Sequence, residues 1–297
     1  MAQQKIGFIV DSSIGLFGDE ILSDDTRQVF FNITDKNNVE YEDNNLILSR
    51  EEILKQYLLG NQFKTSAVSP GKVEIVLEEL LETYDKVILF TVSSGLSCFY
   101  DSVQYLLEDY KDRFYIVDTK EVGYSIATML SAAKTMLNQG KDFFEVLEFC
   151  RNYYLYNFTS FTCENWSPLV NSGRVPALVS KFLNALKTRP IINFDIKNKL
   201  GGVVKSFEAA VEKIFNNFKK VFGPSIFKEQ EYIVFYNNKI EESKAEYIRN
   251  KIVEKFNITK DKIIEMFVPN LVLIYTANGS FGLHIRGKTK ASGRDKE

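Results

Sequence analysis

The stretch VILFTVSSGLS, residues Val87–Ser97, runs from an apolar strand into a turn rich in hydroxyl groups. Its first four residues form a continuous apolar run, which is typical of a parallel strand buried on both faces. The segment that follows, Ser97–Tyr110, predicts a helix. A strand that runs into a helix presents free backbone N–H groups beside the hydroxyls of Ser93 and Ser94. This geometry favours binding of an anion.

Strand-like and helix-like segments alternate through the first half of the chain. The expected strands are Ile6–Val10, Val29–Ile33, Val87–Phe90 and Phe114–Val117. The expected helices are Arg50–Leu59, Pro70–Thr83, Ser97–Tyr110, Gly123–Asn138 and Phe143–Tyr154. Ser69 is expected to cap the helix that begins at Pro70, a residue that needs no N–H partner there. The alternation predicts a parallel sheet with helices on both faces.

The second half reads as an α+β domain with a largely antiparallel sheet. Its expected strands are Pro190–Asp195, Gly202–Ser206, Tyr232–Tyr236, Ile263–Met266 and Leu271–Tyr275. Its expected helices are Ala177–Lys187, Phe207–Val221 and Ser243–Lys255. A cluster of turn residues precedes them, so we predict one domain over residues 1–160 and a smaller one over residues 161–297.

Composition excludes several classes of function. The net charge of -2 gives no global attraction to nucleic acid. No apolar run approaches the roughly 18 residues that an integral membrane segment needs. The three cysteines have no C-x-x-C spacing, and the N-terminus enters a strand without an apolar signal region. We therefore expect a soluble cytoplasmic protein.

Three hydroxyl-bearing turns are expected at the carboxyl edge of the parallel sheet, where ligands gather in such folds. They are Asp11-Ser12-Ser13, Thr65-Ser66 and Ser93-Ser94. Local capping explains any one of them, whereas three on one edge favour a shared ligand. Asp11 could orient a ligand hydroxyl, bind a metal, or satisfy the N–H groups of its own turn.

The chain lacks the usual sets of catalytic residues. A serine nucleophile needs a base, and the single histidine, His284, stands in an apparent strand. No G-x-S-x-G elbow, metal-binding cluster or glycine-rich cofactor loop is present. We therefore predict no catalytic residue, metal or cofactor, and binding becomes the leading hypothesis. Arg174 reads as a solvated turn residue. The glycines within Asn278–Leu283 allow either a positive φ or a close backbone approach.

Several motifs, in this order, resemble the DegV family of bacterial lipid-binding proteins, and the resemblance covers nearly the whole chain. The Ser93–Ser97 motif, with Tyr100 and Ser102, is close to the most specific motif of the family. The other matching segments are Phe8–Ser13, Thr65–Gly71, Val117–Lys120, Ser172–Val175, Thr188–Ile192 and Gly279–Leu283.

The resemblance implies a Rossmann-like N-terminal domain, a smaller α+β C-terminal domain and an apolar ligand tunnel between them. It also implies that the protein binds a long-chain fatty acid and presents it to a separate fatty acid kinase, without catalysing the reaction itself. The carboxylate would be held by Thr65, Ser66, Ser93 and Ser94.

The chain departs from the family pattern at three places. Tyr275, which we also expect to bind the carboxylate, stands where many members carry a histidine that helps to hold it. Its hydroxyl can donate one hydrogen bond, but it is not cationic at neutral pH. Lys205 is the nearest match to an arginine that engages the kinase, and Arg174 is a second candidate for that contact. Cys98 and Phe99 replace the small residues that follow the serine motif in the family, which predicts a narrower pocket wall. Two alternatives stay open: a binder of another apolar anionic lipid, and a serine-dependent hydrolase or acyltransferase that needs His284 near Ser93 or Ser94.

Overall fold

The computed structural model describes residues 4–164, 166–175, 188–276 and 279–292. The chain forms two compact units: residues 1–153 with Pro269–Leu271 make the first, and residues 154–268 with 272–297 make the second. The expected boundary lay after residue 160. The expected helix Ala177–Lys187 lies outside the described residues, and the expected ligand tunnel stays a prediction.

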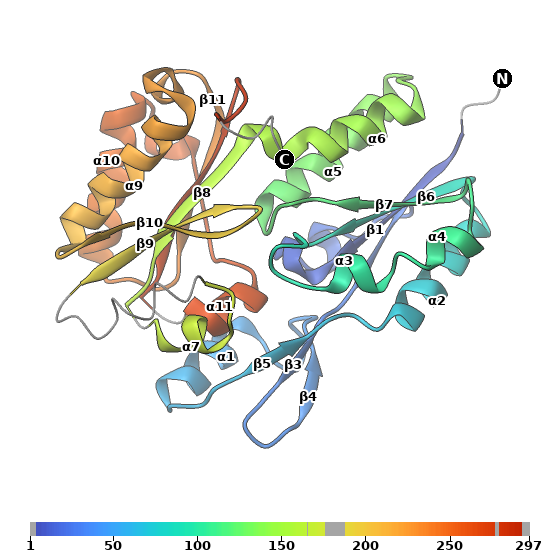
Figure 1. The fold of residues 1–297 in the computed structure, drawn as a ribbon, viewed down its shortest axis with the longest axis horizontal. Helices are drawn as coiled ribbons and strands as arrows, with labels where there is room; N and C mark the ends of the chain where they lie inside the picture. The colour runs from blue at the N-terminus through green and yellow to red at the C-terminus, as the bar shows by residue number, and fades with distance from the viewer. Residues whose placement is uncertain (1–3, 165, 176–187, 277–278, 293–297) are drawn as a thin grey trace. The chain divides into compact units, whose positions relative to one another are not determined.

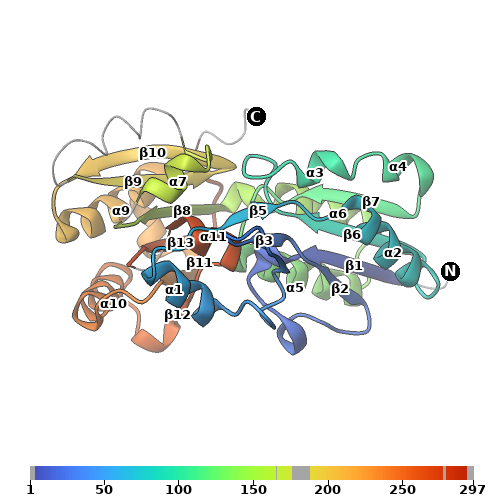
Figure 2. The same ribbon diagram turned by 90° about the horizontal axis from the view of Figure 1, so that it is seen from below.

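The first unit is built on a parallel sheet of four strands in the order β2-β1-β6-β7 (Figure 1; all four strands are labelled in Figure 2). The strands are β1 (Ile6–Asp11), β2 (Thr26–Val29), β6 (Lys86–Thr91) and β7 (Phe114–Asp118). The central strands β1 and β6 are almost entirely buried, because helices cover both faces of the sheet. The predicted α/β class is confirmed.

The two faces of this sheet have separate apolar cores, because side chains alternate along a strand. On one face, Phe8 and Phe90 pack with α5 (Tyr124–Asn138) and α6 (Phe143–Asn152). On the other face, Leu89 packs with α2 and the short helices α3 and α4, whose bounds are Pro70–Leu81, Phe99–Ser102 and Leu106–Asp109. Figure 1 shows α5 and α6 on one side of this sheet and α2, α3 and α4 on the other, and Figure 2 shows the same sheet face-on.

The expected strand Val29–Ile33 is wrong, because the chain leaves the parallel sheet in the middle of it. The amide of Phe31 donates to the hydroxyl of Ser12 at 3.2 Å, outside any strand ladder. Beyond that point the chain enters a separate three-stranded antiparallel sheet in the order β4-β3-β5. Its strands are β3 (Asn32–Thr34), β4 (Glu40–Glu42) and β5 (Lys64–Ser66).

Two predictions about helices also fail in the first unit, one about continuity and one about an N-cap. The expected helix Ser97–Tyr110 is broken into α3 and α4. The Ser102 hydroxyl donates to the carbonyl of Phe99 at 2.7 Å, and such local bonds compete with a continuous helix. Ser69 makes no side-chain cap for α2, although Pro70 does begin that helix. Ser49 caps α1 (Arg50–Leu58) by accepting from the Glu52 amide.

The second unit holds a six-stranded sheet in the order β10-β9-β8-β13-β11-β12. Among the strand pairings of the described residues in this sheet, that of β11 with β12 alone is parallel, so the largely antiparallel prediction is confirmed. The strands are β8 (Asn157–Thr162), β9 (Arg189–Asp195), β10 (Lys197–Val204), β11 (Gln230–Asn237), β12 (Ile263–Met266) and β13 (Phe281–Gly287).

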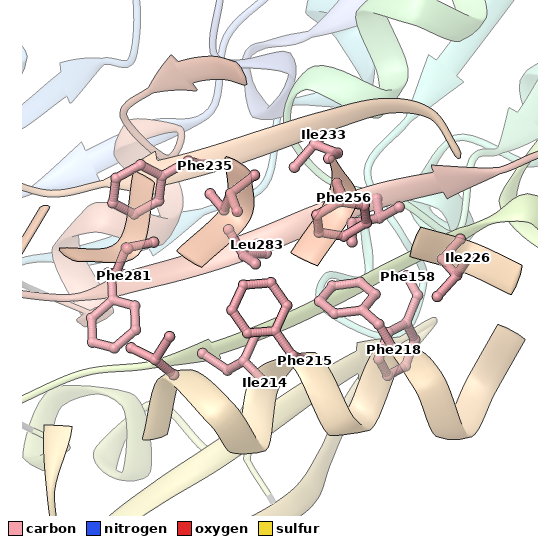
Figure 3. Packing of buried hydrophobic residues seen from close by; sticks show 14 of the residues in the cluster. Phe158, Ile214, Phe215, Phe218, Ile226, Ile233, Phe235, Phe256, Phe281 and Leu283 are labelled. Atoms are coloured by element: carbon pink, nitrogen blue, oxygen red, sulfur yellow. The ribbon is translucent and has the colours of Figure 1, made fainter. Parts of the chain in front are cut away.

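Two amphipathic helices, α9 (Phe207–Phe222) and α10 (Glu242–Phe256), cover one face of this sheet. Figure 3 shows the aromatic core beneath them, in which Phe215 of α9 faces Leu283 of β13 and Phe218 lies beside Phe158 of β8. This core is rich in phenylalanine, and Phe158 packs edge-on against Phe218 at 5.4 Å between ring centroids. Much of the phenylalanine content of the second unit is therefore structural.

The expected strand Leu271–Tyr275 is helical instead, within α11 (Asn270–Thr276). A short apolar run has no period that separates strand from helix, so the sequence alone could not decide this segment. The expected strand Gly202–Ser206 is also displaced, because β10 ends at Val204.

Candidate functional site

The candidate site is the carboxyl edge of the parallel sheet in the first unit. Strands β1, β6 and β7 end there at Asp11, Thr91 and Asp118. Phe90 pairs with both Val10 and Val117 across the three strands, so the turns that follow these strands leave the same edge. The edge therefore gathers the Asp11–Ser13 turn, the Val92–Ser97 turn and the connection from Asp118 to α5.

Backbone N–H groups of the Ser93-Ser94 turn are already used within the protein. The Ser93 amide donates to the carbonyl of Glu121 at 2.9 Å, and the Ser94 amide donates to Asp118 Oδ1 at 3.1 Å. The Gly95 amide donates to the Ser93 hydroxyl at 3.2 Å. The expectation of free N–H groups at this turn is therefore wrong. Because α3 begins only at Phe99, no long helix starts here.

The two serine hydroxyls differ in exposure and in partner. Ser93 is fully buried, whereas Ser94 is exposed. The Ser94 hydroxyl donates to Asp118 Oδ2 at 2.6 Å. The Lys120 amide also donates to Asp118 Oδ1 at 3.1 Å, with Lys120 in a left-handed conformation at φ 54°. The half-buried carboxylate of Asp118 thus receives two bonds from Ser94 and one from Lys120.

Asp11 holds the start of the same turn. Its Oδ2 accepts from the Val92 amide at 2.6 Å, and its Oδ1 accepts from the Ser13 amide at 2.8 Å. Burial raises its pKa to about 6, and the hydrogen bonds from Ser13 and Val92 oppose that rise. The structure supports one of the roles expected for Asp11, in which its carboxylate accepts a hydrogen bond from a backbone N–H group of its own turn. The same carboxylate also accepts from the Val92 amide, in the turn that follows β6.

Asp43 and Asn270 form a buried polar pair that the sequence reasoning missed. Asn270 Nδ2 donates to Asp43 Oδ1 at 3.0 Å, and both side chains are fully buried. Burial raises the pKa of Asp43 to about 7. Hydrogen bonds from Ser12 and Asn270 and the charge of Arg50 lower this pKa, whereas the charge of Asp11 raises it. Asp43 stands in the polar run EDNN, which reads as a loop and carries no signal of burial.

Thr65 and Ser66 lie in β5, so they belong to the three-stranded sheet and not to the parallel one. They pair with Ile33 and Asn32 respectively. Thr65 is half-buried and Ser66 is exposed. The expectation that all three hydroxyl turns share one sheet edge is therefore wrong, and a shared role for Thr65, Ser66 and Ser93 stays a prediction.

Tyr275 and Arg174 lie together in the second unit. The Arg174 guanidinium carbon lies 4.8 Å from the centroid of the Tyr275 ring, within the range of a cation–π contact. Tyr275 is buried on α11, whereas Arg174 is half-buried, so Arg174 is partly solvated and also contacts the tyrosine ring. The structure thereby brings a cation to Tyr275, the residue that we expect at the position of the family histidine. Lys205 is exposed just after β10.

His284 is tied into the sheet of the second unit. Its ring is fully buried, Nδ1 lies 2.9 Å from the Thr159 hydroxyl, and Nε2 lies 3.3 Å from the Tyr232 hydroxyl. Both ring nitrogens are therefore engaged by neighbouring strands, which does not favour a role as base for a serine nucleophile.

The described residues also bear on two other classes of function, metal binding and membrane insertion. No group of three or more histidine, cysteine, aspartate or glutamate side chains in the described ranges could hold a metal ion. Within the same ranges, no helix has both the length and the apolar character needed to cross a membrane.

Curated relatives and solved structures resemble this chain over most of its length. A DegV domain-containing protein of Ureaplasma parvum is 28% identical over 236 residues, which are 79% of each chain. The fatty-acid-binding DegV family protein of Thermus thermophilus superposes with a TM-score of 0.80 at 20% identity, over 95% of this chain and 99% of that one. A stearic-acid-binding protein of Eubacterium ventriosum superposes with a TM-score of 0.76 at 18% identity, over 95% and 98% of the two chains.

These solved structures show a shared fold. Family membership rests on a separate match: the family described as "Uncharacterised protein, DegV family" matches residues 5–288. That range includes the Ser93-Ser94 turn, Asp118 and α11. The chain belongs to the DegV family.

Proposed function

We propose that this protein binds a long-chain fatty acid and presents its carboxylate to a separate fatty acid kinase. The observation that carries the proposal is family membership over residues 5–288, joined to the fold of relatives described as fatty-acid binding. The kinase would supply nucleotide and metal and transfer a phosphoryl group to a carboxylate oxygen, which yields an acyl phosphate and a nucleoside diphosphate. This chain would bind and orient the acid without catalysing the transfer.

The chemistry of the candidate site suits a bound carboxylate that is not transformed. Hydroxyl groups of Thr65, Ser66, Ser93 and Ser94 can donate charge-assisted hydrogen bonds, and none requires a base. Each buried CH₂ group contributes about 0.8 kcal/mol, so a chain of about 16 carbons gains on the order of 10 kcal/mol before ordering costs. The acyl chain would therefore supply most of the affinity, and the head group would supply orientation.

Tyr275 keeps one alternative open, a binder of another apolar anionic lipid. Its ring lies under the Arg174 guanidinium, so a cation is present although the family histidine is replaced. Arginine suits both carboxylate and phosphate oxygens through its planar fork of donors. Lipid extracted from protein purified under native conditions and identified by mass spectrometry separates the two. Fatty acid supports the proposal, whereas an isoprenoid or phospholipid, or no lipid and no affinity for common fatty acids, contradicts it.

Replacing Ser93 and Ser94 together by alanine is expected to weaken palmitate binding by about 1–2 kcal/mol, because two hydroxyl donors are lost while the acyl chain stays buried. Titration calorimetry at pH 8 measures the change, and binding of hexadecanol, which has no charge, serves as the control. Equal losses for palmitate and hexadecanol would mean that the serines support the turn and do not bind the head group.

Lys205 and Arg174 are the proposed contacts with the kinase. Lys205 is exposed just after β10, and its side chain makes no hydrogen bond among the described residues. Lys205→Ala is therefore expected to slow acyl-phosphate formation several-fold and to leave fatty acid affinity unchanged. A coupled assay with the kinase from the same organism measures the rate, and Lys228→Ala provides a matched loss of one charge. Equal rates for Lys205→Ala and wild type would exclude Lys205 from the interface.

A further inference from the structure

The carboxylate of Asp118 occupies the place that a ligand carboxylate would need at Ser94. Its Oδ2 accepts the Ser94 hydroxyl at 2.6 Å, and its Oδ1 accepts the Ser94 amide at 3.1 Å. One carboxylate thus takes both donors of a single serine. These are the donors through which the turn would hold a fatty acid head group, so the protein provides its own carboxylate where the ligand is proposed to bind.

We propose that Asp118 is an internal competitor for the head group, so that a fatty acid must displace it from Ser94 before its own carboxylate can bind there. The inference rests on the proposed function. Two carboxylates cannot share one hydroxyl donor, and like charges at that separation repel each other. The ligand head group therefore exchanges for an existing hydrogen bond and does not add a new one.

Asp118 is positioned so that its carboxylate can move away from Ser94. It is half-buried at the end of β7 and Ser94 is exposed, so a displaced carboxylate can regain water. Its third partner, the Lys120 amide at 3.1 Å, is independent of Ser94 and can stay bound. Asp11, by contrast, is 1% exposed, and each of its oxygens accepts a backbone amide, so it holds the turn and does not exchange.

The competition has a consequence for ligand selection. The Asp118 carboxylate belongs to the same molecule and therefore acts at a high effective concentration. It lowers the affinity for any head group that uses the same donors. The charged head group then adds less to binding than its donors alone would give, so the preference for an acid over an alcohol of equal chain length is reduced. Removal of Asp118 would restore discrimination in favour of the acid.

The test is a double-mutant cycle on Ser94 and Asp118, measured by titration of palmitate and hexadecanol at pH 8. Asp118→Ala is expected to bind palmitate about tenfold more tightly than wild type and hexadecanol unchanged. In a Ser94→Ala background the gain should vanish, because the contested donor is absent. Asp109→Ala, which removes one exposed carboxylate from α4, is the matched control and should leave both affinities unchanged.

Several outcomes overturn the inference without touching the proposed function. They are weaker or equal palmitate binding by Asp118→Ala, an equal gain for hexadecanol, or a gain that persists without Ser94. Asp118→Asn, which keeps a neutral acceptor for the Ser94 hydroxyl, should give an intermediate gain and serves if Asp118→Ala does not fold. Failure of wild type and all variants to bind palmitate contradicts the proposed function, and the inference falls with it.

Discussion

Gly282→Ala is expected to lower the free energy of unfolding of the second unit by about 3 kcal/mol. Gly282 lies in β13 opposite Phe161 of β8. A Cβ at this position would lie 2.5 Å from Phe161 Cβ and 3.0 Å from the carbonyl oxygen of Ser160. Because β13 is also paired with β11 on its other side, the strand cannot move away without loss of one of its ladders.

Gly287→Ala is the matched control for this prediction. It adds the same methyl group to the same strand, but its nearest atoms are side-chain atoms of Ile226 and Phe222 at 3.1 Å. Both substitutions reduce the freedom of the unfolded chain equally, so the difference reports the close strand approach. Urea unfolding followed by fluorescence of Trp166, the single tryptophan, measures it. Equal stabilities of the two variants would contradict the assigned role of Gly282.

The free energy of unfolding of the first unit is expected to fall by on the order of 3 kcal/mol between pH 5 and pH 8, because Asp43 is buried. Its pKa is about 7 in the folded protein against an ordinary value of 3.8. Between these values the folded state keeps the proton that the unfolded state has released. The stabilisation is therefore full below about pH 4 and is lost as the pH rises through 7. Asp11, with a pKa of about 6, contributes with the same sign.

Asp43→Asn tests the source of this pH dependence. Asparagine is neutral and still offers an oxygen to Asn270, so it should raise the free energy of unfolding by about 1–3 kcal/mol at pH 8 and by far less at pH 5. Amide hydrogen exchange of β1 and β6 at the two pH values measures the effect, and comparison with wild type cancels the contributions of other titrating groups. Asp43→Ala, which leaves the Asn270 amide without its carboxylate partner, should destabilise at both values. An equal change for Asp43→Asn at pH 5 and pH 8 would contradict burial of a charge.

Much of the architecture follows from periodic patterns, and the errors have local causes. The apolar run Val87–Phe90 predicts a buried parallel strand, and β6 confirms it. Helix Ser97–Tyr110 was wrong because Ser102 competes for a helical carbonyl. The Leu271–Tyr275 segment was wrong because five apolar residues fit a strand and a helix equally well.

The candidate site was harder to predict than the fold, because hydrogen bonds between distant residues decide it. The Ser93-Ser94 turn is visible in the sequence as a strand end rich in hydroxyls. The hydrogen bond from Ser94 to Asp118 joins residues 24 positions apart, and the one from Val92 to Asp11 joins residues 81 positions apart. The Asp43–Asn270 bond spans 227 positions and has no sequence pattern.

By itself, the sequence determined the family, the alternation of strands and helices and the hydroxyl-rich turn, because periodicity and turn chemistry are local properties of a chain. Only the tertiary structure decided how the donors and charges of that turn are used. The turn was expected to offer free N–H groups to an anion. Instead, those of Val92 and Ser94 bind Asp11 and Asp118 at neighbouring strand ends, and that of Ser93 binds Glu121 in the connection after β7. Strand order brings those acceptors together, and strand order is set by packing over the whole unit.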